Sequence, residues 1–282
     1  MEHSISRRTL VGTGLAALMA GRARAQPVFR FGLTPVFLDN DAAVIDGLRH
    51  ALSSGMGREI ELVQRRTYQE ITGLLLERSV DAAWLCGYPY LQHADLLDLV
   101  AVPVWRGSPR YQSYLIVGTE DRAESLTDLQ GGTHAFSDPD SNSGYLVTAT
   151  DLRRMGEQVE GFFSRSIFTF GHRNVVRAVA DGLMRSGSVD GYVWEALEVI
   201  EPGLTARTRV IARSEWLGFP PVCARRDSLA SDPVQALQTA LMSLAETEEG
   251  RQALRSLQLD GFRQATPALF DGIADRMRDM DP

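Results

Sequence analysis

Apolar and polar residues alternate along the N-terminal third of the chain in an order that predicts strands and helices in turn. Three short runs rich in β-branched and aromatic residues predict buried strands, at 28–35, 59–64 and 80–85. Two longer runs with apolar residues at helical spacing predict helices between them, at 39–55 and 67–79, the first of which should end at Gly55. This order of elements is typical of an α/β sheet with right-handed crossovers.

The same order begins again after residue 105. Runs such as THAF and DGYVW predict further strands, at 133–136, 166–170, 190–194 and 209–212. Helices are expected between them, at 143–155, 174–183 and 196–200. No Pro-rich linker separates the two units, so the chain is expected to cross between them in extended segments near 105–112 and 212–221.

These crossings predict how the chain is divided. Residues 26–106 and 219–282 should form a first lobe, and residues 107–218 a second lobe inserted in it. The helices expected at 233–246 and 249–257 should pack back on the first lobe. The predicted fold class is therefore α/β, with two similar domains joined by extended hinge strands and a cleft between the carboxyl ends of both sheets, where open α/β folds bind their ligands.

The first 25 residues have the organisation of an export signal. Arg7 and Arg8 precede an apolar stretch at 10–20, and Ala23 and Ala25 stand in the small-x-small pattern that signal peptidase reads. The adjacent arginines favour the twin-arginine route, with an ordinary secretory signal as the alternative. No later run reaches 18 consecutive apolar residues, so an exported protein without membrane insertion is expected.

Charge and residue types exclude several classes of site. A formal net charge of −7 argues against binding to nucleic acid or to an anionic membrane. The sequence contains no lysine, which excludes a lysine Schiff base and a P-loop lysine. Cys86 and Cys223 are too few for a disulfide framework, although a bridge between them is an alternative. The histidines lack the spacing of a helix-borne zinc pair, so neither a metal site nor a cofactor is expected.

The stretch SDPDSNSGYL, at 137–146, places small polar residues between a predicted strand and a predicted helix. The first backbone N–H groups of a helix have no acceptor within the helix, and together with the helix dipole they form a site for an anion. Ser141, Asn142 and Ser143 would add side-chain donors, and Gly144 would leave room for close approach of the ligand. The alternative is that Ser141 or Asn142 only caps the helix.

SDPDSNSGYL is similar to the signature of the periplasmic phosphate- and phosphonate-binding protein family. Three further stretches resemble the same family in the same order, namely PVWRGSPRYQSYLIVG, FGHRNVVRAVADGLMRSGSVDGYVW and GFPPVCARRDSL. The similarity spans roughly residues 28–260. It implies a two-lobed periplasmic binding protein fold and a monomer that captures a small oxyanion, such as phosphate, phosphite or a phosphonate, for an ABC permease.

The resemblance also implies roles for individual residues. Ser141, Asn142 and Ser143 would hold the oxyanion, while His172 would donate to it from the facing corner. Tyr68 matches a position where the family places a tyrosine that contacts the ligand. The alternatives are that Tyr68 is a core residue and that His172 is an exposed residue in the first turn of a helix.

The chain departs from the family pattern at two places. Relatives that bind aminoalkyl phosphonates carry an acidic residue just after a strand, whereas Trp194 stands at that place here, so a ligand with an amine is not expected. The segment CGYPY puts Cys86, Tyr88 and Tyr90 where a loop of the first lobe would touch the ligand.

Cys86 is the basis of two rival interpretations. The segment WLCGYPY resembles the loop of arsenite-sensing periplasmic proteins, which implies a sensor that signals to a histidine kinase; the opposite interpretation makes Cys86 a buried core residue. An enzyme with Cys86 as nucleophile and His172 as base is a further alternative. No nucleophile elbow surrounds Cys86, so catalysis is not expected.

Overall fold

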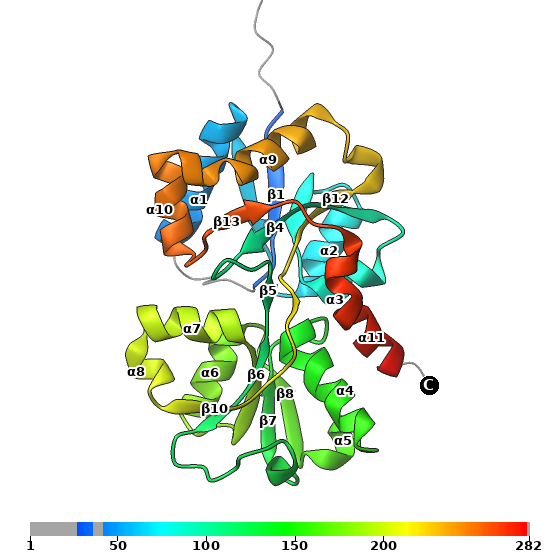
Figure 1. Cartoon of the computed structure of the whole chain (residues 1–282), viewed down its shortest axis with the longest axis vertical. Helices are drawn as coiled ribbons and strands as arrows, with labels where there is room; N and C mark the ends of the chain where they lie inside the picture. Colours follow the sequence, from blue (N-terminus) through cyan, green and yellow to red (C-terminus); the bar gives the residue numbers. More distant parts are fainter. Residues whose placement is uncertain (1–26, 36–41, 281–282) are drawn as a thin grey trace, which may run out of the picture.

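The computed structural model describes residues 27–35 and 42–280 of the 282-residue chain. The export signal predicted for residues 1–25 lies outside these residues. The described strands form two large sheets with helices packed around each, and these are the two lobes that lie one above the other in Figure 1. The predicted fold class, two α/β lobes joined by extended strands, is confirmed.

The first lobe contains a six-stranded sheet whose core is rich in aromatic residues. Its strands follow the order β13 (Gly261–Arg263), β4 (Leu97–Val104), β12 (Val222–Arg225), β3 (Ala82–Trp84), β1 (Phe29–Leu33) and β2 (Ile60–Gln64). β1 runs parallel to β2 and β3, whereas β12 and β13 pair antiparallel with their neighbours. Phe31 and Trp84 are buried beneath the helices of this lobe.

The helices of the first lobe come from both ends of the chain. They are α1 (Ala42–Met56), α2 (Tyr68–Leu76), α3 (Gly87–Gln92), α9 (Asp232–Met242) and α10 (Glu248–Ser256), with short 3₁₀ turns η3 (Arg226–Ser228), η4 (Leu244–Glu246) and η5 (Pro267–Phe270). α9 and α10 pack against α1, as expected. α1 continues past Gly55 because Gly57, at φ +62°, is the residue that takes the left-handed conformation after a helix.

The second lobe contains a five-stranded sheet. Its strands follow the order β10 (Thr208–Arg213), β6 (Ser113–Gly118), β9 (Ser186–Asp190), β7 (Thr133–Phe136) and β8 (Arg165–Phe168). Its helices are η1 (Thr127–Leu129), the π-helical turn η2 (Asn142–Leu146), α4 (Val147–Arg154), α5 (Val159–Phe162), α6 (His172–Ala180), α7 (Gly191–Ile200) and α8 (Pro202–Thr205).

Two secondary-structure predictions are wrong. DGYVW is not a strand, because β9 ends at Asp190 and its carboxylate accepts hydrogen bonds from the N–H groups of Tyr192 and Val193, which starts α7. CGYPY is not a loop, because α3 begins directly after Cys86.

Extended segments connect the lobes near the middle of the molecule. β5 (Arg110–Tyr111) and β11 (Leu217–Gly218) pair antiparallel between the two large sheets. The helix α11 (Asp271–Met280), which the sequence did not predict, contacts α3 in one lobe and α4 in the other and runs along one side of both (Figure 1). None of the helices in the described ranges is long and apolar enough to cross a membrane.

Candidate functional site

The predicted anion-binding corner lies directly after β7, in the interior between the lobes. Ser141, Asn142, Ser143 and Gly144 are all buried. Ser141 caps the turn, since its Oγ accepts a hydrogen bond from the N–H of Gly144 at 3.0 Å. Ser141 is therefore the cap, while the side chains of Asn142 and Ser143 are not; whether Ser141 also contacts a ligand stays a prediction.

Asn142 has one side-chain atom without a partner. Its Nδ2 donates to the hydroxyl of Tyr111 at 2.8 Å, but its Oδ1 is buried and forms no hydrogen bond. An amide oxygen and nitrogen can exchange places by rotation, so either group can face the interior. One polar end of Asn142 is thus available to a bound ligand, and an unpaired buried polar atom is costly without one.

Residues of the first lobe face this corner. The backbone N–H of Asn142 donates to Sγ of Cys86 at 3.3 Å, and the N–H of Tyr68 donates to Oδ2 of Asp138 at 3.2 Å. The Tyr68 hydroxyl lies 3.2 Å from Nε2 of His172. These contacts bring together four of the predicted residues, Tyr68, Cys86, Asn142 and His172, in a structure with its lobes closed.

His172 is the first residue of α6 and is buried rather than exposed. Its Nδ1 accepts a hydrogen bond from the N–H of Asp190 at 3.0 Å, which leaves the proton of the neutral ring on Nε2, facing Tyr68. Burial lowers the pKa of His172 to about 3. At neutral pH the ring therefore acts as an uncharged hydrogen-bond donor.

Asp190 is a buried residue of this cluster that the sequence reasoning missed. It ends β9, and desolvation raises its pKa to about 8. The strand was predicted to continue to Trp194, and that prediction hid an acidic residue at the true end of the strand. The strand ends instead at Asp190, whose buried carboxyl caps the first turn of α7.

Trp194 lies in α7 and Tyr88 lies in α3, whereas the sequence predicted a strand end and a loop at these places. Trp194 sits on the side of α7 that faces β10, where its indole N–H donates to Oγ1 of Thr208 at 3.0 Å. Tyr88 is half-buried in α3, two residues after Cys86. The structure does not bring Trp194 into the cluster around Asn142.

Two residues of the hinge support the corner, and neither was predicted. Tyr111 of β5 is fully buried against Asn142, and desolvation raises the pKa of its hydroxyl well above the usual value. Ser113, the first residue of β6, donates from Oγ to the carbonyl oxygen of Ser143 at 2.6 Å. The only sequence signal for them is their place in the predicted crossing segment.

Cys86 is a buried thiol. It is only 2% exposed, and desolvation raises its pKa to about 12, so it is protonated at neutral pH. Both Cys86 and Cys223 are free, so the alternative of a bridge between them is wrong. The thiol is therefore not an activated nucleophile.

We expect Cys86 to react slowly with a disulfide reagent in the native protein. A thiol with a pKa near 12 has a thiolate fraction of about 10⁻⁴ at pH 8, and burial restricts access further. Native and denatured protein in a Cys223→Ala background would be compared by the rate of thiol labelling. Native labelling within about tenfold of the denatured rate would contradict the buried assignment.

The titration of Asp190 predicts how stability depends on pH. The folded pKa is about 8 and the unfolded value is 3.8, so the stabilisation is complete below pH 3.8 and is lost as the pH rises through 8. The free energy of unfolding should fall by up to about 1.4 kcal/mol per pH unit between about pH 6.5 and 8. The lowered pKa values of His172 and His134 change the free energy of unfolding only below about pH 6.5, the pKa of a histidine in the unfolded chain.

Urea unfolding of the wild type and of Asp190→Asn at about pH 6.5, 7.5 and 8.5 would measure this slope. Asparagine keeps the helix cap but does not titrate, so the slope should be lost in the variant. Equal slopes in both proteins would contradict the prediction.

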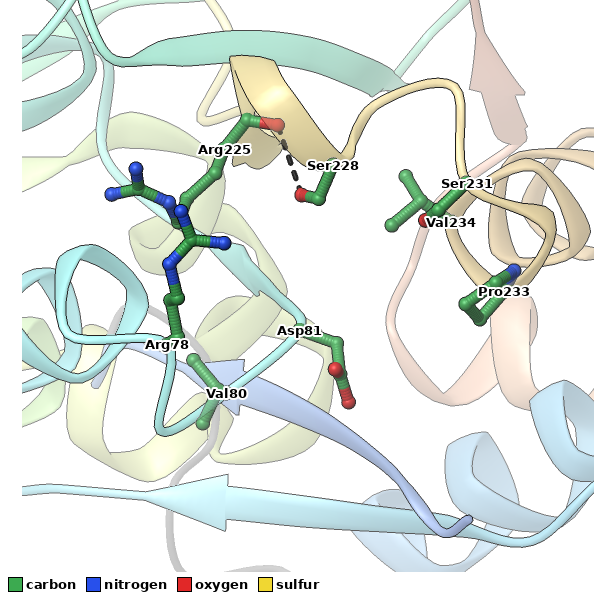
Figure 2. A pocket seen from close by; sticks show the side chains of 8 residues that line it. All are labelled: Arg78, Val80, Asp81, Arg225, Ser228, Ser231, Pro233 and Val234. Carbon is green, nitrogen blue, oxygen red and sulfur yellow. Dashed lines mark hydrogen bonds between the residues drawn. The ribbon is translucent and has the colours of Figure 1, made fainter. Parts of the chain in front are cut away.

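Other features of the surface do not compete with this cluster. Figure 2 shows a hollow of about 100 Å³ lined only by residues of the first lobe, among them Arg78 and Arg225. Asp227 bonds to both guanidinium groups, so one carboxylate is shared between the two charges. Across residues 27–35 and 42–280, no group of three His, Cys, Asp or Glu side chains is placed to hold a metal ion.

Comparisons with known proteins bear on the family and the fold. Residues 31–270 match the family described as the periplasmic substrate-binding protein of a phosphonate ABC transporter. A binding protein of a phosphonate ABC transporter from Pseudomonas aeruginosa has a TM-score of 0.82 at 22% identity, covering 90% of this chain and 88% of that one. PhnD1 from Prochlorococcus marinus, solved with methylphosphonate, has a TM-score of 0.78 at 18% identity, covering 90% and 98%. At these identities the two structures show the shared fold.

Proposed function

The chain belongs to the family of periplasmic substrate-binding proteins of phosphonate ABC transporters, and we propose that it binds a small phosphate-like oxyanion between its lobes. The ligand class comprises phosphate, phosphite and phosphonates. The observation that carries the proposal is the cluster of buried hydrogen-bonding groups that both lobes contribute around Asn142.

The groups of this cluster suit an anion. Five groups can donate a hydrogen bond to a ligand oxygen. They are the backbone N–H and the side-chain amide of Asn142, the hydroxyl of Ser143, the Nε2 proton of His172 and the hydroxyl of Tyr68. In the structure, the N–H of Asn142 donates to Cys86, and the Tyr68 hydroxyl and His172 contact each other. Binding would exchange these weaker contacts for charge-assisted hydrogen bonds, while the lobes exclude water.

The buried carboxyl of Asp190 bears on the choice of ligand. Burial raises its pKa to about 8, so the protonated carboxyl could donate to an oxyanion and the ionised carboxylate could pair with an amine. The PhnD1 structure holds methylphosphonate, which has no amine. Ligands with and without an amine therefore both belong in a binding screen.

Export and delivery complete the proposal. The signal-like residues 1–25, with Arg7 and Arg8, would direct the protein to the periplasm by the twin-arginine route, and an ABC permease would receive the ligand. A sensor role is the second candidate, because a histidine kinase sensor domain has a TM-score of 0.56 at 15% identity. The family match favours transport, and nothing in the cluster calls for catalysis.

Titration calorimetry against phosphate, phosphite, methylphosphonate, aminoethylphosphonate, arsenate, arsenite and sulfate would test the ligand class. Ser143→Ala should weaken binding of the best oxyanion by about 1–3 kcal/mol, since a charged acceptor loses a donor. Ser166→Ala, at an exposed position of β8, is the matched control and should leave affinity unchanged. No binding of any oxyanion to the wild type would refute the proposal.

A further inference from the structure

The first residues of α2 and α6 face each other across the boundary between the lobes, where the Tyr68 hydroxyl lies 3.2 Å from Nε2 of His172. A second contact between the lobes lies two residues before each helix. The guanidinium of Arg66 lies over the ring of Phe170, with Cζ 5.3 Å from the ring centroid. Tyr68 and His172 are buried, whereas Arg66 is exposed and Phe170 is half-buried. The Arg66–Phe170 contact therefore lies at the rim, on the solvent side of the cluster around Asn142.

Phe170 has a strained backbone conformation. Its φ is +53°, in the left-handed region, where a bulky side chain is rare and costs free energy. Thr169 fixes this turn, because its N–H donates to the Phe136 carbonyl oxygen at 2.9 Å and its Oγ1 lies 3.1 Å from the Gly171 carbonyl oxygen. Asn174 of α6 donates from Nδ2 to the Thr169 carbonyl oxygen at 3.1 Å. All these contacts lie within the second lobe, so they hold the turn whatever the position of the first.

The ring of Phe170 does not serve the core of its own lobe. Among the described residues, the half-buried apolar side chains that pack against the two hydrophobic cores do not include Phe170. Backbone strain persists only where the surrounding structure enforces it, and it gathers at functional sites such as ligand clamps. A strained aromatic residue outside the core therefore points to the contact that its ring makes with Arg66 of the other lobe.

Arg66 supplies the positive charge for this contact. It lies in the first lobe, between the end of β2 and the start of α2. A guanidinium group is attracted to the negative face of an aromatic ring, and the attraction grows as water is excluded from the contact. The neighbouring Arg65 differs, since its Nη1 donates to the Gln64 carbonyl oxygen at 2.7 Å. Because Arg66 and Phe170 belong to different lobes, their contact requires the lobes to be closed.

We propose that Arg66 and Phe170 form a clasp at the rim that stabilises the closed lobes and slows release of the bound oxyanion. The inference rests on the proposed function, because the clasp affects retention only if the interior holds a ligand. Neither residue needs to touch the ligand. The contact stabilises the closed state and must break before the lobes open, so it lowers the dissociation rate. The strained turn fixes the ring before closure, so little conformational freedom is lost when the contact forms.

Stopped-flow kinetics on the purified protein test the clasp, with whichever anion of the calorimetric screen binds the wild type most tightly as the probe. Phe170→Asn and Arg66→Gln should each raise the release rate by about three- to tenfold, and the double variant should release no faster than the single variants. The urea midpoint of Phe170→Asn should not fall, because asparagine adopts a positive φ more readily. Phe170→Tyr keeps the ring and should release at the wild-type rate. Arg65→Gln removes the same charge next door and should stay within about twofold.

The outcomes separate the clasp from the proposed function. A wild type that binds no anion of the screen would refute the proposed function and the clasp with it, whereas binding with wild-type release in both single variants would refute the clasp alone. Additive effects in the double variant would show two independent residues and overturn the inference. Slower association of Arg66→Gln with unchanged release would show electrostatic attraction instead. A lower urea midpoint of Phe170→Asn with unchanged release would show that the ring only packs.

Discussion

Gly144→Ala is expected to abolish oxyanion binding, with a loss of at least about a hundredfold in affinity. A Cβ at this position would lie 1.8 Å from Oγ and 2.7 Å from Cβ of Ser137, and 2.9 Å from Oγ of Ser141. Atoms cannot approach so closely, so the end of β7 and the first turn of η2 must separate. The free energy of unfolding should also fall by about 1–3 kcal/mol. Calorimetry and urea unfolding measure the two effects.

This steric explanation differs from the one based on sequence, in which Gly144 leaves room for the ligand. Here it leaves room for Ser137, whose N–H donates to the Gly144 carbonyl oxygen at 3.2 Å. The double variant Ser137→Gly with Gly144→Ala should therefore recover part of the stability, because it removes both Ser137 atoms from the clash. Gly161→Ala, where an added Cβ meets nothing within 4 Å, is the control and should be tolerated. Wild-type affinity in Gly144→Ala would refute this explanation.

Arg276→Met is expected to lower the free energy of unfolding by about 3 kcal/mol or more. The guanidinium of Arg276 is buried in α11, where it donates to the Val147 carbonyl oxygen at 3.0 Å, to Thr150 Oγ1 at 2.6 Å and to Asp151 Oδ1 at 2.8 Å. It also forms a bidentate pair with Glu215, at 2.8 and 2.7 Å. Methionine fills similar volume but supplies no donor, so the carboxylates and the carbonyl would lose their partners together.

Urea unfolding measures this effect, and Arg278→Met on the same helix is the matched control. Arg278 is exposed, and among the described residues it forms an ion pair with Asp275 one turn away, so its loss should cost less than about 1 kcal/mol. A similar loss in the free energy of unfolding for both variants would show that the buried contacts of Arg276 do not stabilise the protein. The prediction also bears on the fold, since Arg276 ties the C-terminal helix to α4 of the second lobe.

Local sequence pattern was sufficient to locate the corner that we propose binds an anion. A strand end, a capping serine and a helix start are formed by neighbouring residues, so SDPDSNSGYL indicates the turn whatever the rest of the chain does. The same holds for His172, at the start of α6, and for Tyr68, at the start of α2, where Thr67 and Glu70 form a capping box. Whether these residues contact a ligand stays a prediction.

Apolar pattern was not sufficient where it fits both a strand and a helix. The run GYVWEALEVI contains β-branched and aromatic residues, and only the bonds from Asp190 to Tyr192 and Val193 begin α7 at Gly191. The short strands β12 and β13 were missed because three or four residues carry no period of their own. α11 was missed because it is mostly polar, and its buried residues include the charged Arg276.

The chain by itself thus indicated the alternation of strands and helices in both lobes and the residues of the corner, since these depend on short-range propensity and spacing. The export signal at residues 1–25 stays a prediction. Tertiary structure decided the rest. That Cys86 is buried against Asn142, that Tyr111 supports Asn142 and that Asp190 lies beside His172 are contacts between residues 18 to 56 positions apart. Burial and pKa follow from such contacts, because desolvation depends on what the folded chain packs around a group and not on its neighbours in sequence.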